Sequence, residues 1–229
     1  MNKGLDMTNQ MISYPFSAVL FDMDGVIIDN TPLHQSVWQE FAHLHGLNPS
    51  KDVIRATNGR RAVDVVLSLF GSIPHAQVVE LAAARGVLYR QRLATTDIQP
   101  VSGVKSFLEK LGALGVPRVL ATSARPDNVT LVLNRLQLFN YFENIVSASD
   151  VCNGKPDPEV YLTAARRAFV QPETCLVIED SLPGIVAAKA AGSFCLGMTT
   201  SQSEESLKQV GADWVAPDFC NLPNQLQIA

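Results

Sequence analysis

The sequence predicts an α/β protein with a doubly wound parallel sheet and a single helical insertion. Short, continuously apolar runs recur along the chain, and each is followed by a stretch with helical periodicity. Strands that are apolar on both faces are typical of a parallel sheet that helices cover on both sides. The alternation fails between residues 30 and 97, where apolar residues recur only at helical spacing. We therefore expect a Rossmann-like core with a helical bundle inserted after its first strand.

The expected core elements share short apolar, β-branched runs that end in polar or small residues. The strand candidates lie at residues 17–21, 117–121, 144–147, 175–178, 194–196 and 213–215. The helical stretches that alternate with them lie at 102–114, 127–137, 157–169, 182–191 and 203–210. Ligands of such folds bind at the carboxyl ends of the strands, so we expect functional residues in the loops that follow them.

The insertion at residues 30–97 is too long for a connecting loop and too helical for a disordered segment. We expect a cap domain over the edge of the sheet, and a discontinuous core at 15–29 and 98–229. Residues 1–14 are mostly polar, and we expect a flexible tail there. The cap helices are expected at 32–46, 50–56, 61–70 and 75–93.

Composition argues against several classes of protein. Apolar residues make up 47% of the 229 residues and charged residues 17%, which excludes intrinsic disorder. The net charge of −4 argues against a nucleic-acid or anionic-membrane surface. No run is long and apolar enough to predict a membrane helix, and the first residues do not resemble a signal peptide. The four cysteines form no C-x-x-C pair, so we expect buried thiols in a cytoplasmic protein, a monomer by default.

Acidic pairs follow two of the predicted strands. Residues i and i+2 of an extended segment point the same way, so Asp22 and Asp24 are expected to share one side, and Gly25 permits a sharp turn. The strand at 175–178 leads directly into Glu179 and Asp180. Carboxylates gathered at one edge need a cation, and Mg²⁺ is usually held by one or two carboxylates, waters and a substrate phosphate. Read alone, the first pair could form a turn and the second could cap a helix.

Hydroxyl and basic residues occupy the loops after two other strands. Thr122 and Ser123 come just before a helix, where hydroxyls and backbone N–H groups can bind an anion. An ordinary helix cap would explain the same residues. Lys155 is fixed between a glycine and a proline ahead of the strongly capped helix at 157–169. Together with the acidic pairs, these donors suit phosphoryl transfer, which depends mainly on positioning and charge neutralisation.

Four motifs occur in order along the chain: DMDGVIID at 22–29, TS at 122–123, GKPDP at 154–158 and IEDSLPG at 178–184. With these motifs the chain resembles the haloacid dehalogenase superfamily of phosphohydrolases. It is most similar to the β-phosphoglucomutase-like branch, which also contains small sugar-phosphate phosphatases. The resemblance spans nearly the whole chain and implies that the helical insertion is the family's four-helix cap.

The resemblance implies a two-step mechanism with Mg²⁺. Asp22 would attack phosphorus and form an aspartyl-phosphate. Asp24 would protonate the leaving oxygen and then activate the attacking water. The metal would bind the Asp22 carboxylate, the Asp24 main-chain carbonyl and Asp180, and Glu179 would assist directly or through water.

The resemblance also assigns the phosphate contacts. Thr122 and the Ser123 amide would hold phosphate oxygens, and Gly25 with the following amides would complete the cradle. Lys155 would neutralise Asp22 and the transferring group. Ser181 would hydrogen-bond near the metal site.

Cap residues are implicated in the same way. His34 falls where the mutase-like branch often places a histidine that reaches the active site, although a helix histidine is otherwise a surface or core residue. Trp38 shares its helix face and is expected in the cap core. Arg60 and Arg61 lie in a segment that resembles the loop these enzymes lower over the site. Arginines there would grip substrate hydroxyls or a second phosphate, with a solvated charge pair as the alternative, and the sequence does not determine which of the two points inward. Hinge motion is expected at residues 29–30.

The motifs favour a phosphatase over a mutase. A phosphoglucomutase must bind two phosphates and protect its aspartyl-phosphate from water. After the second motif, family mutases resemble SASKN, whereas this chain reads TSARPD at 122–127. Arg125 keeps a cation there, but Ala124 and Pro126 replace the Ser- and Asn-type contacts. We therefore expect hydrolysis of a small phosphorylated metabolite, a phosphomonoester of the sugar-phosphate class, with β-phosphoglucomutase as the alternative.

Two other classes agree less well with the sequence. A phospho-accepting signalling receiver also combines carboxylates, a hydroxyl residue and a lysine with Mg²⁺. Receivers are about half this length, lack a large insertion after the first strand, and carry their phosphorylated aspartate on an inner strand. A dinucleotide-dependent oxidoreductase is disfavoured because no G-x-G-x-x-G follows any predicted strand.

Overall fold

The computed structural model describes residues 14–228. The tail expected at residues 1–14 therefore lies outside the described residues, apart from Tyr14. The Tyr14 ring packs against Phe16 and Phe107, with ring centroids 5.7 and 6.3 Å apart. Tyr14 is thus attached to the core and does not belong to a tail.

Six parallel strands form one sheet in the order β3-β2-β1-β4-β5-β6. All six predicted strands are present, and β1 lies in the middle, paired with β2 on one side and β4 on the other. Because the strands are parallel, the loops that follow β1, β2 and β4 meet at one edge of the sheet. The bounds are β1 (Ala18–Phe21), β2 (Arg118–Ala121), β3 (Asn144–Val146), β4 (Cys175–Glu179), β5 (Phe194–Met198) and β6 (Trp214–Ala216).

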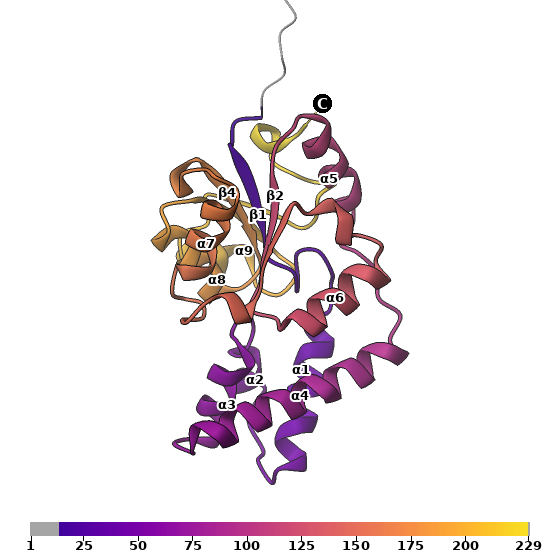
Figure 1. The fold of residues 1–229 in the computed structure, drawn as a ribbon, viewed down its shortest axis with the longest axis vertical. Coiled ribbons are helices and arrows are strands. Elements are labelled where there is room, and N and C mark those ends of the chain that lie inside the picture. The colour runs from indigo at the N-terminus through magenta and orange to yellow at the C-terminus, as the bar shows by residue number, and fades with distance from the viewer. Residues whose placement is uncertain (1–13, 229) are drawn as a thin grey trace, which may run out of the picture.

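Helices cover both faces of the sheet, as the continuously apolar strands predict. Val19 and Phe21 of β1 pack in the layer that α5 and α6 complete, whereas Ala18 and Leu20 pack in the layer of α7 and α8. Figure 1 shows these two pairs of helices on opposite sides of the strands. The bounds are α5 (Val104–Ala113), α6 (Pro126–Arg135), α7 (Glu159–Arg167), α8 (Leu182–Ala190) and α9 (Glu204–Gln209). The doubly wound α/β fold is therefore confirmed.

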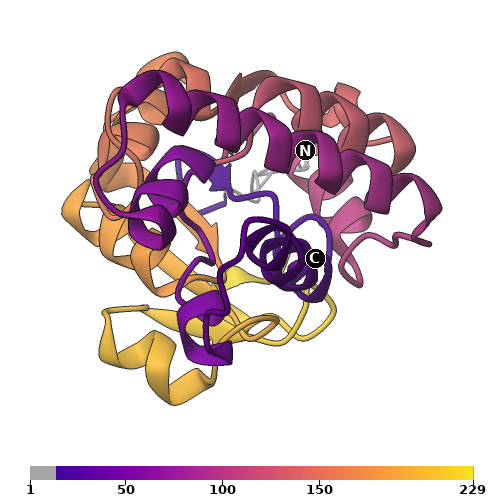
Figure 2. The ribbon, with the colours of Figure 1, turned by 90° about the horizontal axis from the view of Figure 1, so that it is seen from below.

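Four helices lie between β1 and α5, beyond the edge of the sheet where β1 ends (Figures 1 and 2). They are α1 (Thr31–Leu44), α2 (Lys51–Arg55), α3 (Ala62–Phe70) and α4 (His75–Thr95). They bury an apolar cluster of their own, which includes Trp38, Phe41 and Val66. Trp38 is 4% exposed, in agreement with its predicted place in the core of this helical unit. We refer to residues 31–95 as the helical unit.

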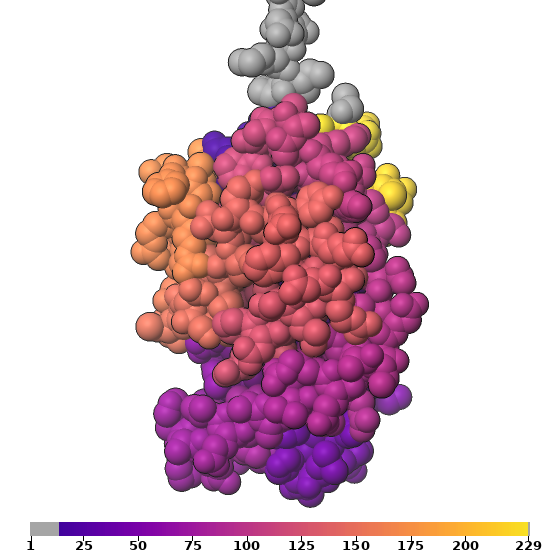
Figure 3. Space-filling view, turned by 45° about the vertical axis from the view of Figure 1, so that its right-hand side comes forward, coloured from indigo at the N-terminus to yellow at the C-terminus, as the bar shows by residue number. Residues whose placement is uncertain are grey.

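The helical unit packs closely against the sheet and its helices. Arg90 on α4 donates a hydrogen bond to Asn128 Oδ1 on α6, over 3.0 Å. Arg135 at the end of α6 donates to the carbonyl of Thr96, just after α4, over 3.0 Å. In Figure 3 the purple helical unit lies directly beneath the salmon-coloured segment that contains α6. The two parts of the chain therefore enclose the space between them.

Two of the four cysteines differ from the sequence-based expectation. Cys175 and Cys195 are buried, as their apolar neighbours predict, but Cys152 and Cys220 are exposed because they lie in loops; all four thiols are free. Among residues 14–228 no single helix is long and apolar enough to cross a membrane. Taken together, α3 and α4 reach that length and hydropathy, but the pair is bent by 115°.

Replacing Leu20 with alanine should lower the free energy of unfolding by about 2–5 kcal/mol, because a fully buried side chain in the central strand leaves a cavity. Urea denaturation followed by circular dichroism measures the change. Leu44→Ala, at a side chain that is 69% exposed, is the matched control and should change it by about 0.5 kcal/mol or less. Equal losses in the two variants would contradict this placement of the core.

Candidate active site

A cavity lies between the carboxyl edge of the sheet and the helical unit, and most of the candidate residues meet there. Figure 2 views the molecule from the side of the helical unit, whose helices cross over this edge. On the sheet side the cavity is lined by Asp22, Asp24, Asp180 and residues 122–125. From the helical unit, His34, Trp38, Asn58, Arg60 and Arg85 contribute to its walls.

Lys155 lies at the base of the site, between two carboxylates. Its ammonium group donates to Asp22 Oδ1 over 2.7 Å and to Glu179 Oε1 over 2.5 Å, and its side chain is fully buried. It also lies 5.0 Å from the centre of the Tyr161 ring. Burial alone would lower the pKa of Lys155, but the Asp22 and Glu179 carboxylates outweigh it and raise this pKa. Lys155 is therefore a fixed positive charge beside Asp22.

Both carboxylate oxygens of Glu179 are occupied by hydrogen bonds. Oε1 accepts from Lys155 and, over 3.1 Å, from the Tyr161 hydroxyl. Oε2 accepts from the backbone N–H groups of Asp180 and Ser181, each over 2.7 Å, and from the Ser181 hydroxyl over 2.9 Å. Glu179 therefore orients Lys155 and the turn that follows β4. The sequence suggests a metal-assisting role for it, and these bonds add a positioning role that the sequence did not reveal.

Asp22 is 4% exposed at the end of β1, and its backbone N–H bonds to Ile178 O on β4 over 3.0 Å. The parallel pairing of β1 with β4 thus sets the side chain beside the Glu179 turn. Burial raises the pKa of Asp22 above its ordinary value, Lys155 opposes this shift, and the neighbouring Glu179 and Asp24 add to it. A buried acid with this environment needs further positive charge to be ionised fully.

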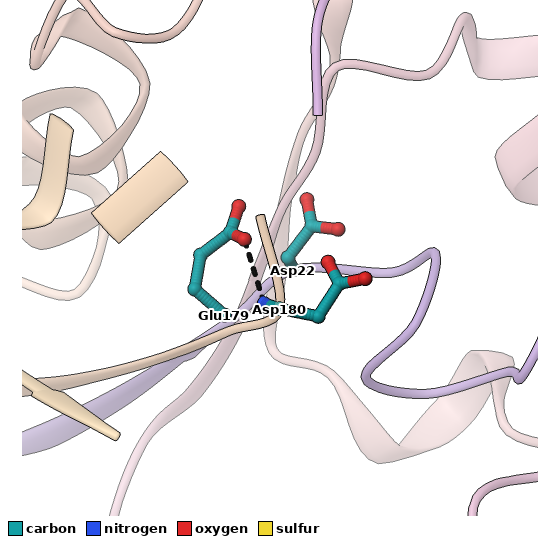
Figure 4. A group of neighbouring side chains, drawn as sticks. All are labelled: Asp22, Glu179 and Asp180. Atoms are coloured by element: carbon teal, nitrogen blue, oxygen red, sulfur yellow. Dashed lines mark hydrogen bonds between the residues drawn. The ribbon is translucent and has the colours of Figure 1, made fainter. Parts of the chain in front are cut away.

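Asp22, Glu179 and Asp180 each have a carboxylate oxygen within 4.8 Å of the others, a spacing that suits a metal ion. In Figure 4 the carboxylates of Asp22 and Asp180 lie next to each other, and that of Glu179 is turned to the other side. Burial raises the pKa of Asp180 well above its ordinary range, and Glu179 and Asp22 raise it further. Hard carboxylate oxygens around a site deficient in positive charge match the donor preference of Mg²⁺.

Gly25 makes room for a neighbouring carboxylate. It has a φ of +84°, and a Cβ atom there would lie 2.0 Å from Asp180 Oδ2. The absence of a side chain at Gly25 therefore allows the Asp180 carboxylate to lie beside Asp22. The place of Gly25 in a phosphate cradle stays a prediction.

Asp24 is held by residues at the start of α1. Its Oδ1 accepts from Asn30 Nδ2 over 2.6 Å and lies 3.2 Å from His34 Nε2. Burial would raise the pKa of Asp24, but His34 and Asn30 outweigh it, so this pKa is lowered from its ordinary value. Asp24 is therefore ionised at neutral pH, which suits a base.

A buried arginine on α4 fixes the His34 ring. Arg85 is 4% exposed and its Nη2 lies 2.9 Å from His34 Nδ1. Because a guanidinium N–H can only donate, Nδ1 accepts, and the ring proton is carried on Nε2, the atom that faces Asp24. The ring also stacks on Tyr89 with centroids 4.3 Å apart. The sequence analysis did not identify Arg85. The signal that could have pointed to it is its position as a charged residue on the otherwise uncharged buried face of α4.

The hydroxyl residues after β2 occupy the wall of the cavity. Thr122 is 1% exposed, and its hydroxyl accepts from Ala124 N over 3.1 Å. Ser123 donates its hydroxyl to the carbonyl of Gly59 in the helical unit over 2.8 Å. The Ser123 hydroxyl thus connects the two parts of the chain, in addition to the amide contact that the sequence predicts for it.

The three candidate arginines separate into two groups. Arg60 and Arg125 line the cavity, as expected. Arg61 does not reach its wall; its guanidinium bonds to Asp64 and to backbone carbonyls of the loop before α7. Arg60 and Arg61 are adjacent in a turn, so their side chains diverge, and one of them is directed to the sheet side. The sequence leaves open which of the two arginines faces the site; in the structure Arg60 lines the cavity, and Arg61 bonds to Asp64 and to the loop before α7.

Known proteins resemble the chain in sequence and in fold. A model of the haloacid dehalogenase-like hydrolase family matches residues 16–192. Validoxylamine A 7'-phosphate phosphatase from Streptomyces hygroscopicus subsp. limoneus is 33% identical over 85% of this chain and 91% of that protein. Beta-phosphoglucomutase from Bacillus subtilis is 30% identical over 91% of this chain and 92% of that protein. A crystal structure of beta-phosphoglucomutase from Clostridium difficile has a TM-score of 0.80 at 27% identity, over 93% of each chain.

The family match includes all four motifs around the cavity, and the relatives are similar over nearly their whole lengths. Their names are those of a phosphatase and of a phosphoglucomutase. The resemblance drawn from the sequence is confirmed: the chain is a hydrolase that belongs to the haloacid dehalogenase-like family, in its β-phosphoglucomutase-like and sugar-phosphate phosphatase branch.

Proposed function

We propose that the chain is a Mg²⁺-dependent phosphatase that hydrolyses a small sugar phosphate through an aspartyl-phosphate. The observation that carries the proposal is the buried Asp22 carboxylate, held by Lys155 beside Asp180 and open to the same cavity as Asp24. A fixed carboxylate with a cation on one side and a second acid nearby suits nucleophilic attack followed by hydrolysis.

Asp22 is the nucleophile in this proposal. Lys155 holds one carboxylate oxygen of Asp22 in place, which orients this side chain for attack. Asp22, Asp180 and the main-chain carbonyl of Asp24 are the residues that would hold Mg²⁺, which supplies positive charge to the carboxylates and to the phosphate. Lys155 neutralises the transferring group, and Thr122 donates to a phosphate oxygen.

Asp24 is the general acid and base. With its lowered pKa it is a carboxylate before substrate binds, which is the form that accepts a proton from water. A phosphate dianion brought next to Asp24 raises this pKa, because two negative charges repel, and so favours the protonated form that the leaving oxygen requires. His34 and Asn30 keep the carboxylate directed into the cavity through both steps.

The helical unit selects the substrate, as a cap domain over residues 30–97. Within residues 14–228, the buried Nδ2 of Asn58 and Nε of Arg85 have no hydrogen-bond partner, although both residues line the cavity. Buried donors without partners are uncommon, and oxygen atoms of a bound ligand would satisfy them. Trp38 and Gly86 line the same cavity. An apolar surface next to unpaired hydrogen-bond donors suits a sugar, whose ring packs on the apolar surface and whose hydroxyl oxygens accept from the donors.

One observation favours a mutase as the second candidate. Arg60 and Arg125 both line the cavity. Two guanidinium groups can hold a second phosphate. A relative named a beta-phosphoglucomutase adds to this alternative.

Phosphate release from a panel of phosphomonoesters tests the proposal. We expect inorganic phosphate from p-nitrophenyl phosphate and, with a higher kcat/KM, from one or more sugar phosphates, because the cavity offers them more hydrogen bonds. The panel includes β-glucose 1-phosphate with its bisphosphate primer. Conversion of it to glucose 6-phosphate without phosphate release would establish the mutase instead, and no turnover of any substrate would refute both activities.

Asp22→Asn should lower kcat by about a thousandfold or more, because an amide does not attack phosphorus. Phosphate release under saturating substrate measures the loss, and circular dichroism checks the fold. Asp52→Asn on α2, where the Asp52 side chain is 90% exposed, is the matched control and should retain the parent rate. An Asp22→Asn enzyme with more than a tenth of the parent kcat would exclude this nucleophile.

Removal of divalent cations should reduce phosphate release to the background rate, because Asp22 and Asp180 would then repel the substrate phosphate. The enzyme is dialysed against EDTA, assayed, and assayed again after Mg²⁺ is added in excess of the chelator. We expect the rate to return with Mg²⁺ and not with Na⁺ at equal ionic strength. Undiminished turnover in the chelator would argue against the metal assignment.

A further inference from the structure

A pair of oppositely charged residues joins the helical unit to the loop that carries Lys155. Arg61 lies just before α3, and its side chain is 15% exposed. Its Nε and Nη2 donate to the two carboxylate oxygens of Asp64 over 2.9 and 3.1 Å. Its remaining nitrogen, Nη1, donates across to the carbonyl of Cys152 over 2.7 Å. The guanidinium is thus shared between the helical unit and the sheet side.

The backbone at Gly154 lies directly under this pair. A Cβ atom at Gly154 would lie 2.6 Å from Arg61 Nε and 2.6 Å from Asp64 Oδ2. Such distances do not occur between real side chains, so the contact exists only because residue 154 has no side chain. Gly154 immediately precedes Lys155 in sequence. The Arg61–Asp64 pair therefore contacts the backbone next to the cation of the active site.

The same loop is held from its other side by α7. Glu159 accepts hydrogen bonds from the backbone N–H groups of Cys152 and Asn153, over 2.9 and 2.8 Å. The N–H groups of this loop therefore face Glu159, while the carbonyl of Cys152 faces Arg61. The loop is clamped between an acid on the core and a cation on the helical unit, and its path to Lys155 depends on both.

A second contact shows that the turn before Arg61 is docked as well. Gly59 accepts the Ser123 hydroxyl, and a Cβ atom at Gly59 would lie 2.1 Å from Ser181 Oγ. Residues 59–64 thus touch the loops after β2 and β4 as well as the loop before α7. The segment of the helical unit that lines the cavity is therefore continuous with the segment that contacts Cys152 and Gly154, just before Lys155.

We propose that the Arg61–Asp64 pair is a positioning device that couples closure of the helical unit over substrate to the placement of Lys155 beside Asp22. Closing the unit brings Arg61 to the Cys152 carbonyl and sets the pair on Gly154, so the loop reaches its catalytic position when the cavity is shut. Asp64 contributes by accepting two hydrogen bonds from the guanidinium, which keeps Arg61 directed toward the loop. The inference rests on the proposed phosphatase function, because the coupling matters only if Lys155 acts on the phosphate in catalysis.

Exposed ion pairs contribute little, and Arg61 differs from them in two ways. Its partners include a backbone carbonyl on the other part of the chain, and most of the side chain is removed from water. By contrast, Arg55 on α2 makes an ion pair with Asp52 in which the two side chains are 60% and 90% exposed. Arg55 therefore provides a matched control on the same helical unit.

Steady-state hydrolysis of p-nitrophenyl phosphate by four variants tests the device. Arg61→Ala removes the donor, and Gly154→Ala puts a methyl group where the pair sits. Each should lower kcat/KM by about tenfold, with part of the loss in kcat, because Lys155 is less well placed. The double variant should be no worse than Gly154→Ala alone, since both changes disrupt the same contact between the pair and the loop. Arg55→Ala should match the parent enzyme.

Hydrogen–deuterium exchange provides a readout that does not depend on activity. In both single variants, backbone amides at residues 152–155 should exchange several-fold faster than in the parent and in Arg55→Ala, and circular dichroism checks that each variant is folded. Unchanged exchange there, or losses in kcat/KM that add in the double variant, would overturn the proposal. If Arg61→Ala fails to fold, Gly154→Ala decides by its kcat/KM and by the exchange at residues 152–155, since it retains both Arg61 and Asp64. A parent enzyme that does not hydrolyse the ester refutes the phosphatase function, while the exchange result still decides whether the pair holds the loop.

Discussion

The buried ammonium group of Lys155 is the interaction on which the site depends. It joins β1, β4 and the loop before α7, because its partners Asp22 and Glu179 end the two adjacent strands. Removing one member of a buried charged group leaves the others unpaired in a medium of low dielectric constant, which is costly. Glu179 is therefore as necessary to the geometry as Asp22, although only Asp22 is open to the cavity. The fold thus positions the Asp22 carboxylate, the nucleophile of our proposal, through the ion pairs that the buried Lys155 makes.

A second chain of contacts gives the helical unit a direct influence on the chemistry. Arg85 sets the tautomer of His34, His34 faces Asp24, and Asn30 bridges Asp24 to the Tyr89 hydroxyl over hydrogen bonds of 2.6 and 2.8 Å. His34 lies on α1, Arg85 and Tyr89 lie on α4, and Asn30 directly precedes α1. Movement of the helical unit would therefore change the environment of Asp24 as well as the access of substrate. In our proposal, substrate binding under the helical unit and proton transfer by Asp24 are linked, because the same helices hold both the cavity wall and the partners of Asp24.

Sequence reasoning predicted the sheet because each strand is a continuously apolar run, and it predicted Asp22, Asp24 and Asp180 because motifs at strand ends stay together in any parallel sheet. The remaining features depend on tertiary packing between distant segments. Arg85 meets His34 across 51 positions of sequence, and no local pattern indicates that distance. Arg60 and Arg61 are chemically identical neighbours, so the sequence cannot tell which of them lines the cavity and which bonds to the loop before α7.

The geometry also explains why closely similar chains can carry the names of a phosphatase and of a mutase. Asp22, Asp24 and Lys155 would serve both reactions, because each begins with transfer of a phosphate to an aspartate. The outcomes differ in what the aspartyl-phosphate meets next: water, or a hydroxyl of a sugar that has stayed in the cavity. That choice depends on how long the helical unit remains closed and on whether it grips the far end of the sugar. The segment at residues 57–64 would take part in both, since residues 57–60 and 62 line the cavity while Gly59 and Arg61 bond to the core loops. A net charge of −4 on the whole chain does not oppose either reaction, because Arg60, Arg85 and Arg125 at the cavity and Lys155 at its base gather positive charge where the phosphate would lie.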